Sequence, residues 1–300
     1  MEFRQAEQFL AVVEHGGLGH AAAALHLAQP SLSQTIRTLE RELKAPLFHR
    51  VGRGLVLTSA GEALVKPARQ LLRDLATARA SVAEVAGIRG GQLDIAAMGG
   101  TLELVLPAVG AFRRQHPEVF VRLECPSMES ELVHQVRQGH SELGFAPLSP
   151  DGDPHQRRGM EITTLPPSPL MLVLPPDTDP GLPDPLPIEQ TPDIPTTAIP
   201  EGAYGRSVVE TALRKAGVRT RIALVTAHRS TQTSLVLRGI GMAFTTRQQA
   251  IRAQERGALI RSLDPPLALP NCAVRRPVPL SPAARSFLAL ATECLGDPTS

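Results

Sequence analysis

"AQPSLSQTIRTLERELKAPLFHR" (residues 28–50) carries the clearest helical pattern in the N-terminal region. Pro30 is tolerated in the first turn of a helix, where its missing N–H would have no partner. From there an apolar residue recurs at intervals of four, three and four positions, which predicts one buried helical stripe. The stripe consists of Leu32, Ile36, Leu39 and Leu43.

The opposite face of this helix carries amide, hydroxyl and guanidinium groups. These belong to Ser31, Ser33, Gln34, Arg37, Thr38 and Arg41. Such groups can reach base edges in a DNA major groove, and the N-terminal N–H groups of a helix favour a phosphate. An ordinary solvated helix face has a similar composition, so this stretch alone leaves both interpretations open.

Two helical segments precede this stretch. Residues 19–27, "GHAAAALHL", have high helix propensity, and Leu25 can face inward. Residues 3–14 bring apolar side chains to one face before the stop "HGG". These side chains are Phe3, Ala6, Phe9, Leu10 and Val13.

A β-hairpin is predicted after the third helix. Two short extended runs, residues 45–50 and 55–61, flank the turn "VGRG", with Arg50 and Arg53 near its tip. Arginines there suit DNA phosphates or a minor groove. Three helices followed by a hairpin predict a winged helix-turn-helix. The candidates for base or phosphate contacts on its third helix are Gln29, Ser33, Gln34 and Arg37.

A long helix is predicted from the N-cap signal at Thr58 onward. Its apolar residues follow a heptad seam that suits a partner helix. They are Leu64, Ala68, Leu71, Leu75, Ala78, Val82 and Val85. The alternative is that the seam packs against its own domain, and Pro67 predicts either a kink or a start in two segments.

Strands and helices alternate after "GIRGG" (residues 87–91), in two sets that begin with "QLDIAAM" and "LMLVLPP". The β–α–β order implies right-handed crossovers and a parallel sheet, so we expect two α/β lobes. Between Pro147 and Pro200 lie 15 of the 28 prolines, which predicts a loop-rich connection with embedded strands.

The composition is ordinary for a globular protein, with 42% hydrophobic and 20% charged residues. Net charge is only +2, but residues 1–90 hold 11 Lys and Arg against 8 Asp and Glu, so any anion-binding surface is local. The chain has no apolar run that could span a membrane and no signal peptide, which predicts a cytoplasmic protein without a membrane partner.

No metal site or catalytic motif can be recognised. Cys125, Cys272 and Cys294 are far apart, which predicts ordinary buried thiols, with a redox sensor as the alternative. The histidines show no ligand-like pairing, and nucleophile elbow, P-loop, dinucleotide-binding and zinc-protease motifs are missing. Glu129 and Glu131 are expected on a helix surface without a basic partner. We therefore expect no enzyme activity and no cofactor.

Residues 1–90 resemble the DNA-binding region of LysR-type transcriptional regulators, whose pattern they follow in order and without a gap. The remainder resembles that family's periplasmic-binding-protein-like effector domain more loosely. The resemblance implies a multidomain protein with an all-α-rich winged helix-turn-helix, a linker and dimerisation helix, and a two-lobed α/β effector domain. The expected bounds are 1–58, 59–90 and 91–300, with lobe I comprising 91–160 and 266–300 and lobe II 161–265.

The resemblance also implies partners. It implies a homodimer or homotetramer that binds a two-fold-related site in double-stranded promoter DNA, responds to a small-molecule effector and has RNA polymerase as a further partner. Family DNA contacts map onto Gln29, Pro30, Ser31, Ser33, Gln34, Arg50 and Arg53.

Two segments depart from the family pattern. Where the family has a Ser-aromatic-Thr segment before the alanines of its second helix, this chain has Gly-Leu-Gly at 17–19. The missing hydroxyl could have capped the helix or touched a phosphate, so its loss predicts weaker or altered DNA affinity. The family's Asp-Leu-Ala strand ending is Glu-Leu-Gly here, at 142–144.

Effector contacts are expected where strand ends and helix N-termini converge between two α/β lobes. This rule and the resemblance select the same loops, with Gly99, Gly100, Thr101, Ser127, Met128, Pro200, Gly202 and Tyr204. Plainer alternatives stay open: Gly99 and Gly100 as turn residues, Ser127 as a helix cap, and Tyr204 as a packing residue.

Together these patterns predict a transcriptional regulator whose DNA binding changes when a small effector binds between the lobes. The alternative is a cytoplasmic small-molecule-binding module with a degenerate DNA-binding domain. The intact third helix favours the regulator.

Overall fold

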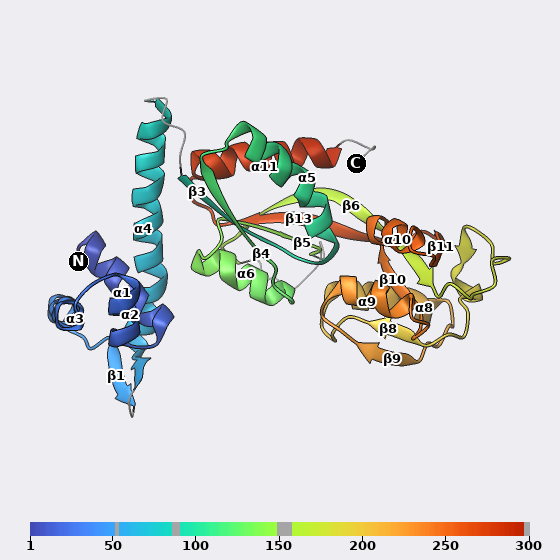
Figure 1. Ribbon diagram of the computed structural model, residues 1–300, viewed down its shortest axis with the longest axis horizontal. Helices are drawn as coiled ribbons and strands as arrows, with labels where there is room; N and C mark the ends of the chain where they lie inside the picture. Colours follow the sequence, from blue (N-terminus) through green and yellow to red (C-terminus); the bar gives the residue numbers. More distant parts are fainter. Residues whose placement is uncertain (52–53, 86–90, 149–157, 297–300) are drawn as a thin grey trace. The chain divides into compact units, whose positions relative to one another are not determined.

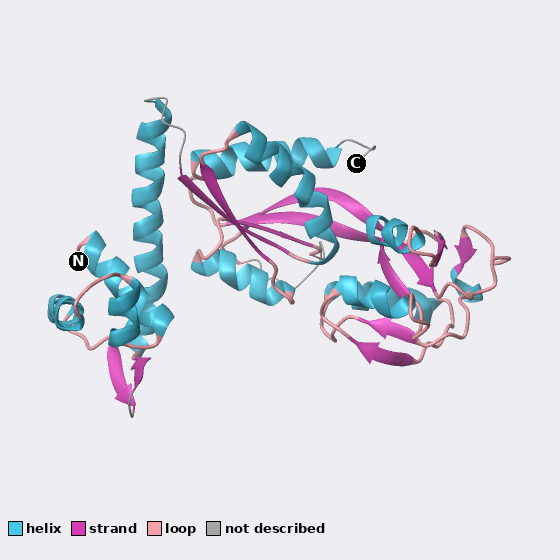
Figure 2. Ribbon diagram, viewed as in Figure 1, coloured by secondary structure: helices cyan, strands magenta, loops and turns pink. Residues whose placement is uncertain are grey.

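Two compact units make up the protein (Figure 1). This computed structural model describes residues 1–51, 54–85, 91–148 and 158–296. The first unit consists mainly of Met1–Gly91, and the second of most of the remaining chain. Figure 2 shows that the first is helical with one hairpin, whereas helices and strands alternate in the second.

The first unit is a winged helix-turn-helix, as predicted. Three helices are followed by an antiparallel hairpin and a long helix. Their bounds are α1 (Phe3–His15), α2 (Leu18–Ala24), α3 (Gln29–Leu43), β1 (Phe48–Val51), β2 (Gly54–Leu57) and α4 (Ser59–Val85). Gly16 ends α1 in the left-handed conformation, with φ 66°, which confirms the predicted stop.

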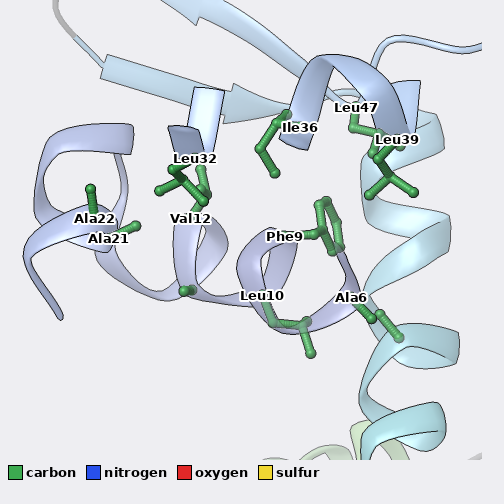
Figure 3. Close-up of a cluster of buried hydrophobic side chains, with 12 residues drawn as sticks. Ala6, Phe9, Leu10, Val12, Ala21, Ala22, Leu32, Ile36, Leu39 and Leu47 are labelled. Carbon is green, nitrogen blue, oxygen red and sulfur yellow. The ribbon is translucent and has the colours of Figure 1, made fainter. Parts of the chain in front are cut away.

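One apolar cluster holds the three helices together (Figure 3). Phe9, Leu32 and Leu39 are fully buried in it, and each such side chain stabilises the fold by about 1.5–3 kcal/mol. Two residues of the predicted stripes are not part of this core: Phe3 is 45% and Leu43 is 40% exposed. Each is a terminal residue of its helix, where the neighbouring helices no longer cover the stripe.

The N-terminus of α4 is capped as predicted. The Gly61 N–H donates to Thr58 Oγ1 at 3.0 Å, and Thr58 Oγ1 in turn donates to the Pro46 carbonyl at 2.6 Å. Pro67 lies inside the helix, which is continuous from Ser59 to Val85, so the expectation of a start in two segments is wrong.

The predicted heptad seam of α4 divides into two parts. Its first three residues pack into the core of the first unit, as the own-domain alternative requires: Leu64, Ala68 and Leu71. Farther along, Leu75 is half-buried, Ala78 is exposed, and Val82 is 71% exposed. The side chain of Val85 lies outside the described residues. The later part of the seam is therefore the part that leaves apolar side chains free for a partner helix.

A seven-stranded sheet forms the centre of the second unit, in the order β10-β6-β13-β5-β3-β4, with β11 also paired to β6. Helices α5 and α11 lie over one face of its larger part and α6 over the other (Figure 1). We call this part lobe I. It contains β3 (Gly91–Ala97), α5 (Gly99–Gln115), β4 (Val119–Glu124), α6 (Glu129–Gln138), β5 (Leu143–Ala146) and α11 (Pro282–Gly296).

Two long strands connect lobe I with a smaller lobe II. Strand β6 (Glu161–Leu174) pairs with β13 (Ala268–Arg275) along its first part and with β10 and β11 along its last part. Lobe II contains β7 (Leu186–Pro187), a 3₁₀ turn (Ile188–Gln190), β8 (Thr196–Ala198), α8 (Tyr204–Lys215), β9 (Ile222–Val225), α9 (Arg229–Val236), β10 (Ala243–Thr246), α10 (Arg247–Gln254), β11 (Leu259–Arg261) and β12 (Leu263–Asp264).

The sheet is mixed, which corrects the expectation of a parallel sheet. Strands β3 and β5 do pair in parallel, as a β–α–β unit requires. However, β13 runs antiparallel to both β5 and β6, and β10 runs antiparallel to β6. The reason is topological: one strand takes the chain out to lobe II and another brings it back, so the two must run in opposite directions.

The glycine in the departing segment 142–144 has a packing role. A Cβ built at Gly144 would lie 2.7 Å from Leu132 Cδ2 and 2.8 Å from Val136 Cγ2, both on α6. Helix α6 therefore packs against β5 more closely than an alanine at this position would allow.

Candidate DNA-binding and effector-binding sites

The N-terminal half of α3 presents the side chains expected to contact DNA. Their exposure is confirmed for five of the residues: Gln29, Pro30, Ser31, Gln34 and Arg37. Ser33, by contrast, is half-buried. Ala28 is the N-cap and provides no side-chain cap. Pro30 has no N–H, and the Ser31 N–H donates to the Ala28 carbonyl at 3.0 Å, so the Gln29 N–H is the group in this first turn that can donate to an anion.

A shallow hollow beside α3 adds to the positive charge of this surface. It is lined by Arg37, Arg41 and Lys44, and Glu40 is the acidic member among its described lining residues. The Glu40 carboxylate is already engaged, because its Oε1 accepts from the N–H groups of Leu47 at 2.8 Å and Phe48 at 3.4 Å. The three cationic side chains therefore dominate the charge that this hollow can offer to a phosphate.

Glu40 also positions the wing, since its two hydrogen bonds tie α3 to the start of β1. Sequence reasoning missed this residue because it resembles any charged residue on a helix surface. Within the wing, backbone pairing sets Arg50 opposite Leu55. The side chain of Arg50 and the whole of Arg53 lie outside the described residues.

The N-terminus of α2 has room for the hydroxyl that the family pattern leads one to expect. Gly17 is its N-cap, with extended backbone and no side-chain cap. A Cβ built at Gly17 would meet nothing within 4 Å, and one at Gly19 would lie 3.7 Å from Gln29 Oε1. Leu18 packs against the core of the first unit. The departure thus leaves α2 uncapped without disturbing its packing.

Gly99 and Gly100 are placed between the lobes, where backbone conformation and packing require glycine. Gly99 begins α5 with φ 55°, in the left-handed region. Gly100 is buried, and a Cβ built there would lie 2.2 Å from Cγ2 of Thr246 in lobe II. These facts support their interpretation as turn residues.

Thr101 is fully buried and takes part in a polar network at the connection between the lobes. Its Oγ1 donates to Asn271 Oδ1 at 2.7 Å. The Asn271 amide donates to the Pro166 carbonyl at 2.8 Å and to Ser168 Oγ at 2.9 Å. Asn271 lies on β13, whereas Pro166 and Ser168 lie on β6. The Thr101 hydroxyl is therefore linked through Asn271 to both connecting strands. Sequence reasoning did not find Asn271.

Three of the other predicted effector residues meet across the two lobes. Met128 Cε lies 3.6 Å from the position of a Cβ at Gly202. Beside them, Glu129 Oε1 accepts the Tyr204 N–H at 3.0 Å, and Glu129 is only 7% exposed. The expectation that Glu129 lies on a helix surface is therefore wrong. A carboxylate is favourable at this position because the first N–H groups of α8 have no partner within the helix.

The remaining loop residues favour local roles. The Ser127 N–H donates to Glu131 Oε2 at 3.1 Å beside the start of α6. The half-buried Pro200 accepts from the Ala203 N–H at 3.3 Å in a turn before α8. Tyr204 is half-buried and lines a hollow within lobe II. Packing is thus the interpretation that the surroundings of Tyr204 support.

The three cysteines are free thiols in different environments. Cys272 is buried, as predicted, but Cys125 is exposed and Cys294 is intermediate, so the prediction of buried thiols is wrong for Cys125. Partial burial raises the pKa of the Cys125 thiol, and the neighbouring Glu124 carboxylate raises this pKa further. A raised pKa disfavours the reactive thiolate, which argues against a redox-sensing role for Cys125.

Over the parts of the chain that the structure describes, His, Cys, Asp and Glu side chains do not gather in groups of three that could hold a metal ion. The described helices are also too short or too polar to cross a membrane.

Two family models match this chain. Residues 3–62 match the bacterial regulatory helix-turn-helix protein, lysR family, and residues 86–295 match the LysR substrate binding domain.

Several curated regulators are similar. The HTH-type transcriptional regulator TfdT of Cupriavidus pinatubonensis is 37% identical over 153 residues, which are 50% of this chain and 66% of TfdT. The nitrogen assimilation regulatory protein nac of Escherichia coli is 38% identical over 41% of each chain. The HTH-type transcriptional regulator AlsR of Bacillus subtilis is 30% identical over 247 residues, 81% of this chain and 80% of AlsR. The chain therefore spans less than two thirds of TfdT and of nac in these alignments.

Solved structures share the fold over almost the whole chain. Full-length CbnR, crystallised in complex with its target DNA, has a TM-score of 0.69 at 23% identity and covers 98% of this chain and 100% of its own. A full-length OxyR variant from Pseudomonas aeruginosa has a TM-score of 0.75 at 19% identity, and the match covers 100% of this chain and 96% of the OxyR chain.

Proposed function

Because this chain belongs to the LysR family of transcriptional regulators, we propose that it controls transcription by binding promoter DNA through α3 and the wing. We propose further that a small molecule bound between lobes I and II changes this DNA binding. The alternative, a small-molecule-binding module with a degenerate DNA-binding domain, is not favoured, since the first unit keeps a complete core and an exposed α3.

The exposed N-terminal half of α3 is the observation that carries the proposal. The amide of Gln34 suits an adenine edge, and Arg37 suits a guanine or a phosphate. Leu32 and Ile36, buried on the opposite side, hold the helix in place so that these groups are presented rigidly. Arg50 and Arg53 of the wing are proposed to contact phosphates or an adjacent minor groove. CbnR, which shares this fold, was crystallised in complex with its target DNA.

The proposed assembly is a homodimer or homotetramer that forms through the later part of the α4 seam. Two-fold symmetry of the protein would require a two-fold-related DNA site. The bounds 1–58, 59–90 and 91–300 for the three domains, with the lobe division given above, remain predictions. So do the cytoplasmic location and RNA polymerase as a partner.

The proposed effector site lies among the loops at residues 99–101, 127–128 and 200–204. Support comes from the contacts that already link the lobes there, the Glu129–Tyr204 hydrogen bond and the Gly100–Thr246 packing. An effector that makes different contacts in two arrangements of the lobes shifts the balance between them, and thereby the affinity for DNA.

Binding of purified full-length protein to its own promoter region tests the regulator function. We expect a footprint on a two-fold-related site, with an affinity that falls steeply between 50 and 200 mM salt because phosphate contacts release counterions. Gln34→Ala should cost about 1–3 kcal/mol on the matched site and relax the preference at one base position. Arg53→Ala should weaken matched and mismatched sites alike.

The absence of any footprint at low salt, on its own and all neighbouring promoters, would contradict the regulator function. Equal losses for Gln34→Ala and Arg53→Ala on matched and mismatched DNA would leave DNA binding intact but refute the separate roles of α3 and the wing.

A further inference from the structure

Lys44 ends helix α3 in a backbone conformation that a lysine rarely adopts. It has φ 53° and ψ 31°, in the left-handed region, where the Cβ of an L-residue comes too close to the following carbonyl oxygen. Glycine is the usual residue at such a position, because it has no Cβ. A glycine would end α3 in the same way without this strain, so the fold of the helix end does not require a lysine.

Hydrogen bonds around Lys44 fix this conformation. The Lys44 N–H donates to the Arg41 carbonyl at 3.3 Å. The Ala45 N–H donates to the Glu40 carbonyl at 3.1 Å, and the Glu40 carboxylate ties the start of β1 to α3. Several bonds therefore hold the chain between α3 and the wing at once, which is how a strained residue persists in a fold.

The side chain of Lys44 is exposed, and none of the ion pairs among the described residues includes it. The two acidic residues nearest to it in the sequence have other partners. Glu40 accepts from N–H groups of the wing, and Glu42 Oε2 lies 3.0 Å from the N-terminal ammonium of Met1. A cation is favourable near the C-terminus of a helix, but Arg41 already provides one in the last turn of α3. The charge of Lys44 can therefore serve a partner outside the chain.

Lys44 continues a polar stripe that begins with Gln34, the proposed base reader. Polar positions recur there at intervals of three, four and three, which places their side chains on one face of α3. These residues are Gln34, Arg37, Arg41 and Lys44, and all four line the shallow hollow beside α3. Lys44 lies about 15 Å from Gln34 along the helix axis, whereas the major groove is about 12 Å wide. At that distance, the phosphates at the edge of the groove are the DNA groups within its reach.

We propose that Lys44 binds a DNA phosphate at the edge of the major groove that α3 occupies, and that this lysine strengthens DNA binding while it weakens the fold. The inference rests on the proposed binding of promoter DNA through α3. A phosphate contact carries no sequence information, so Lys44 adds affinity for DNA of any sequence, whereas Gln34 distinguishes between bases.

Three substitutions separate the charge of Lys44 from its backbone strain. Lys44→Gly removes both the charge and the Cβ, Lys44→Gln removes the charge and keeps the Cβ, and Lys44→Arg keeps both. Fluorescence anisotropy measures how the full-length proteins bind two fluorescein-labelled duplexes of equal length, one from the chain's own promoter region and one of unrelated sequence. Each titration is repeated between about 50 and 200 mM salt, where phosphate contacts dominate the change in affinity.

We expect Lys44→Gly and Lys44→Gln to reduce the slope of log affinity against log salt concentration by about 0.9 for each half-site bound, because each chain loses one phosphate contact. The same slope corresponds to a loss of about fifteenfold at 50 mM and about fourfold at 200 mM salt per half-site, equal on both duplexes. Lys44→Arg should bind as the unaltered protein does. In urea unfolding followed by circular dichroism, Lys44→Gly should have a higher midpoint than Lys44→Gln, since left-handed strain outweighs the extra freedom of glycine in the unfolded chain.

The proposal is overturned if Lys44→Gly and Lys44→Gln keep the salt slope of the unaltered protein, or if Lys44→Arg loses as much affinity as Lys44→Gln. It is also overturned if Lys44→Gly unfolds at no higher urea concentration than Lys44→Gln. In each of these cases the unaltered protein still binds its promoter, so the regulator function stands. If the unaltered protein binds neither duplex at low salt, the regulator function and this inference fail together.

Discussion

Gly61 shows how a single missing side chain positions the wing. It lies in the first turn of α4, and a Cβ built there would be 2.2 Å from the Leu47 carbonyl oxygen and 2.8 Å from Leu57 Cδ2. Because Leu47 immediately precedes β1 and Leu57 ends β2, Gly61 lets α4 approach both ends of the hairpin. The sequence revealed the N-cap at Thr58 but not this approach, since the partner atoms of a glycine leave no pattern in the chain.

Gly61→Ala is therefore expected to destabilise the protein by about 1–3 kcal/mol, because a backbone oxygen cannot move aside as a side-chain tip can. Urea unfolding followed by circular dichroism measures the change. Gly17→Ser is the matched comparison: its Cβ meets open space and its hydroxyl can cap α2, so it should stabilise by a few tenths of a kcal/mol. If Gly61→Ala leaves the free energy of unfolding unchanged, α4 can move away from the hairpin to make room for the methyl group.

At the scale of elements, α4 serves two purposes along one apolar seam. Its first part completes the core of the first unit, through residues such as the fully buried Ala68. Its later part leaves Ala78 and Val82 exposed. Heptad spacing predicted the seam correctly but could not divide it, because the period of a helix does not reveal which of its turns are covered by the same chain.

The double substitution Ala78→Glu and Val82→Glu should lower the oligomeric mass of the protein, because two carboxylates would be buried without partners in a helix pair. Light scattering with size-exclusion chromatography measures that mass. Arg79→Glu adds a carboxylate on the same stretch of α4 without replacing an apolar residue of the seam, and should leave the mass unchanged. If the unaltered protein, the double variant and Arg79→Glu all have the same mass, α4 is not part of the oligomer interface.

At the scale of the whole molecule, the second unit is held together by contacts between segments far apart in the chain. Glu129 and Tyr204 are 75 residues apart, and Thr101 and Asn271 are 170 apart. The first pair joins α6 of lobe I to α8 of lobe II, and the second joins α5 to a connecting strand. Any change in the relation between the lobes must alter such contacts, so they are where an effector would exert its influence.

Glu129→Ala should lower the free energy of unfolding by about 1–3 kcal/mol, because the Tyr204 N–H loses a charged acceptor. Chemical denaturation measures this loss. The matched control is Glu131→Ala on the same helix, whose carboxylate accepts from the Ser127 N–H within lobe I. Its loss should be smaller, since that contact is exposed and local. If the two variants lose equally, the Glu129 carboxylate does not tie the lobes.

The winged helix-turn-helix, the outward face of α3 and the two-lobed α/β organisation could all be predicted from the amino-acid sequence. These depend on local periodicity and end signals, which each short segment carries within itself. The folded structure was needed to show that β13 lies between β5 and β6, that Glu129 is buried against α8, and that Thr101 is held by Asn271. Each of these features is a contact between residues that lie far apart in the chain. The residue types and spacing within one short segment do not reveal which distant residues that segment will contact.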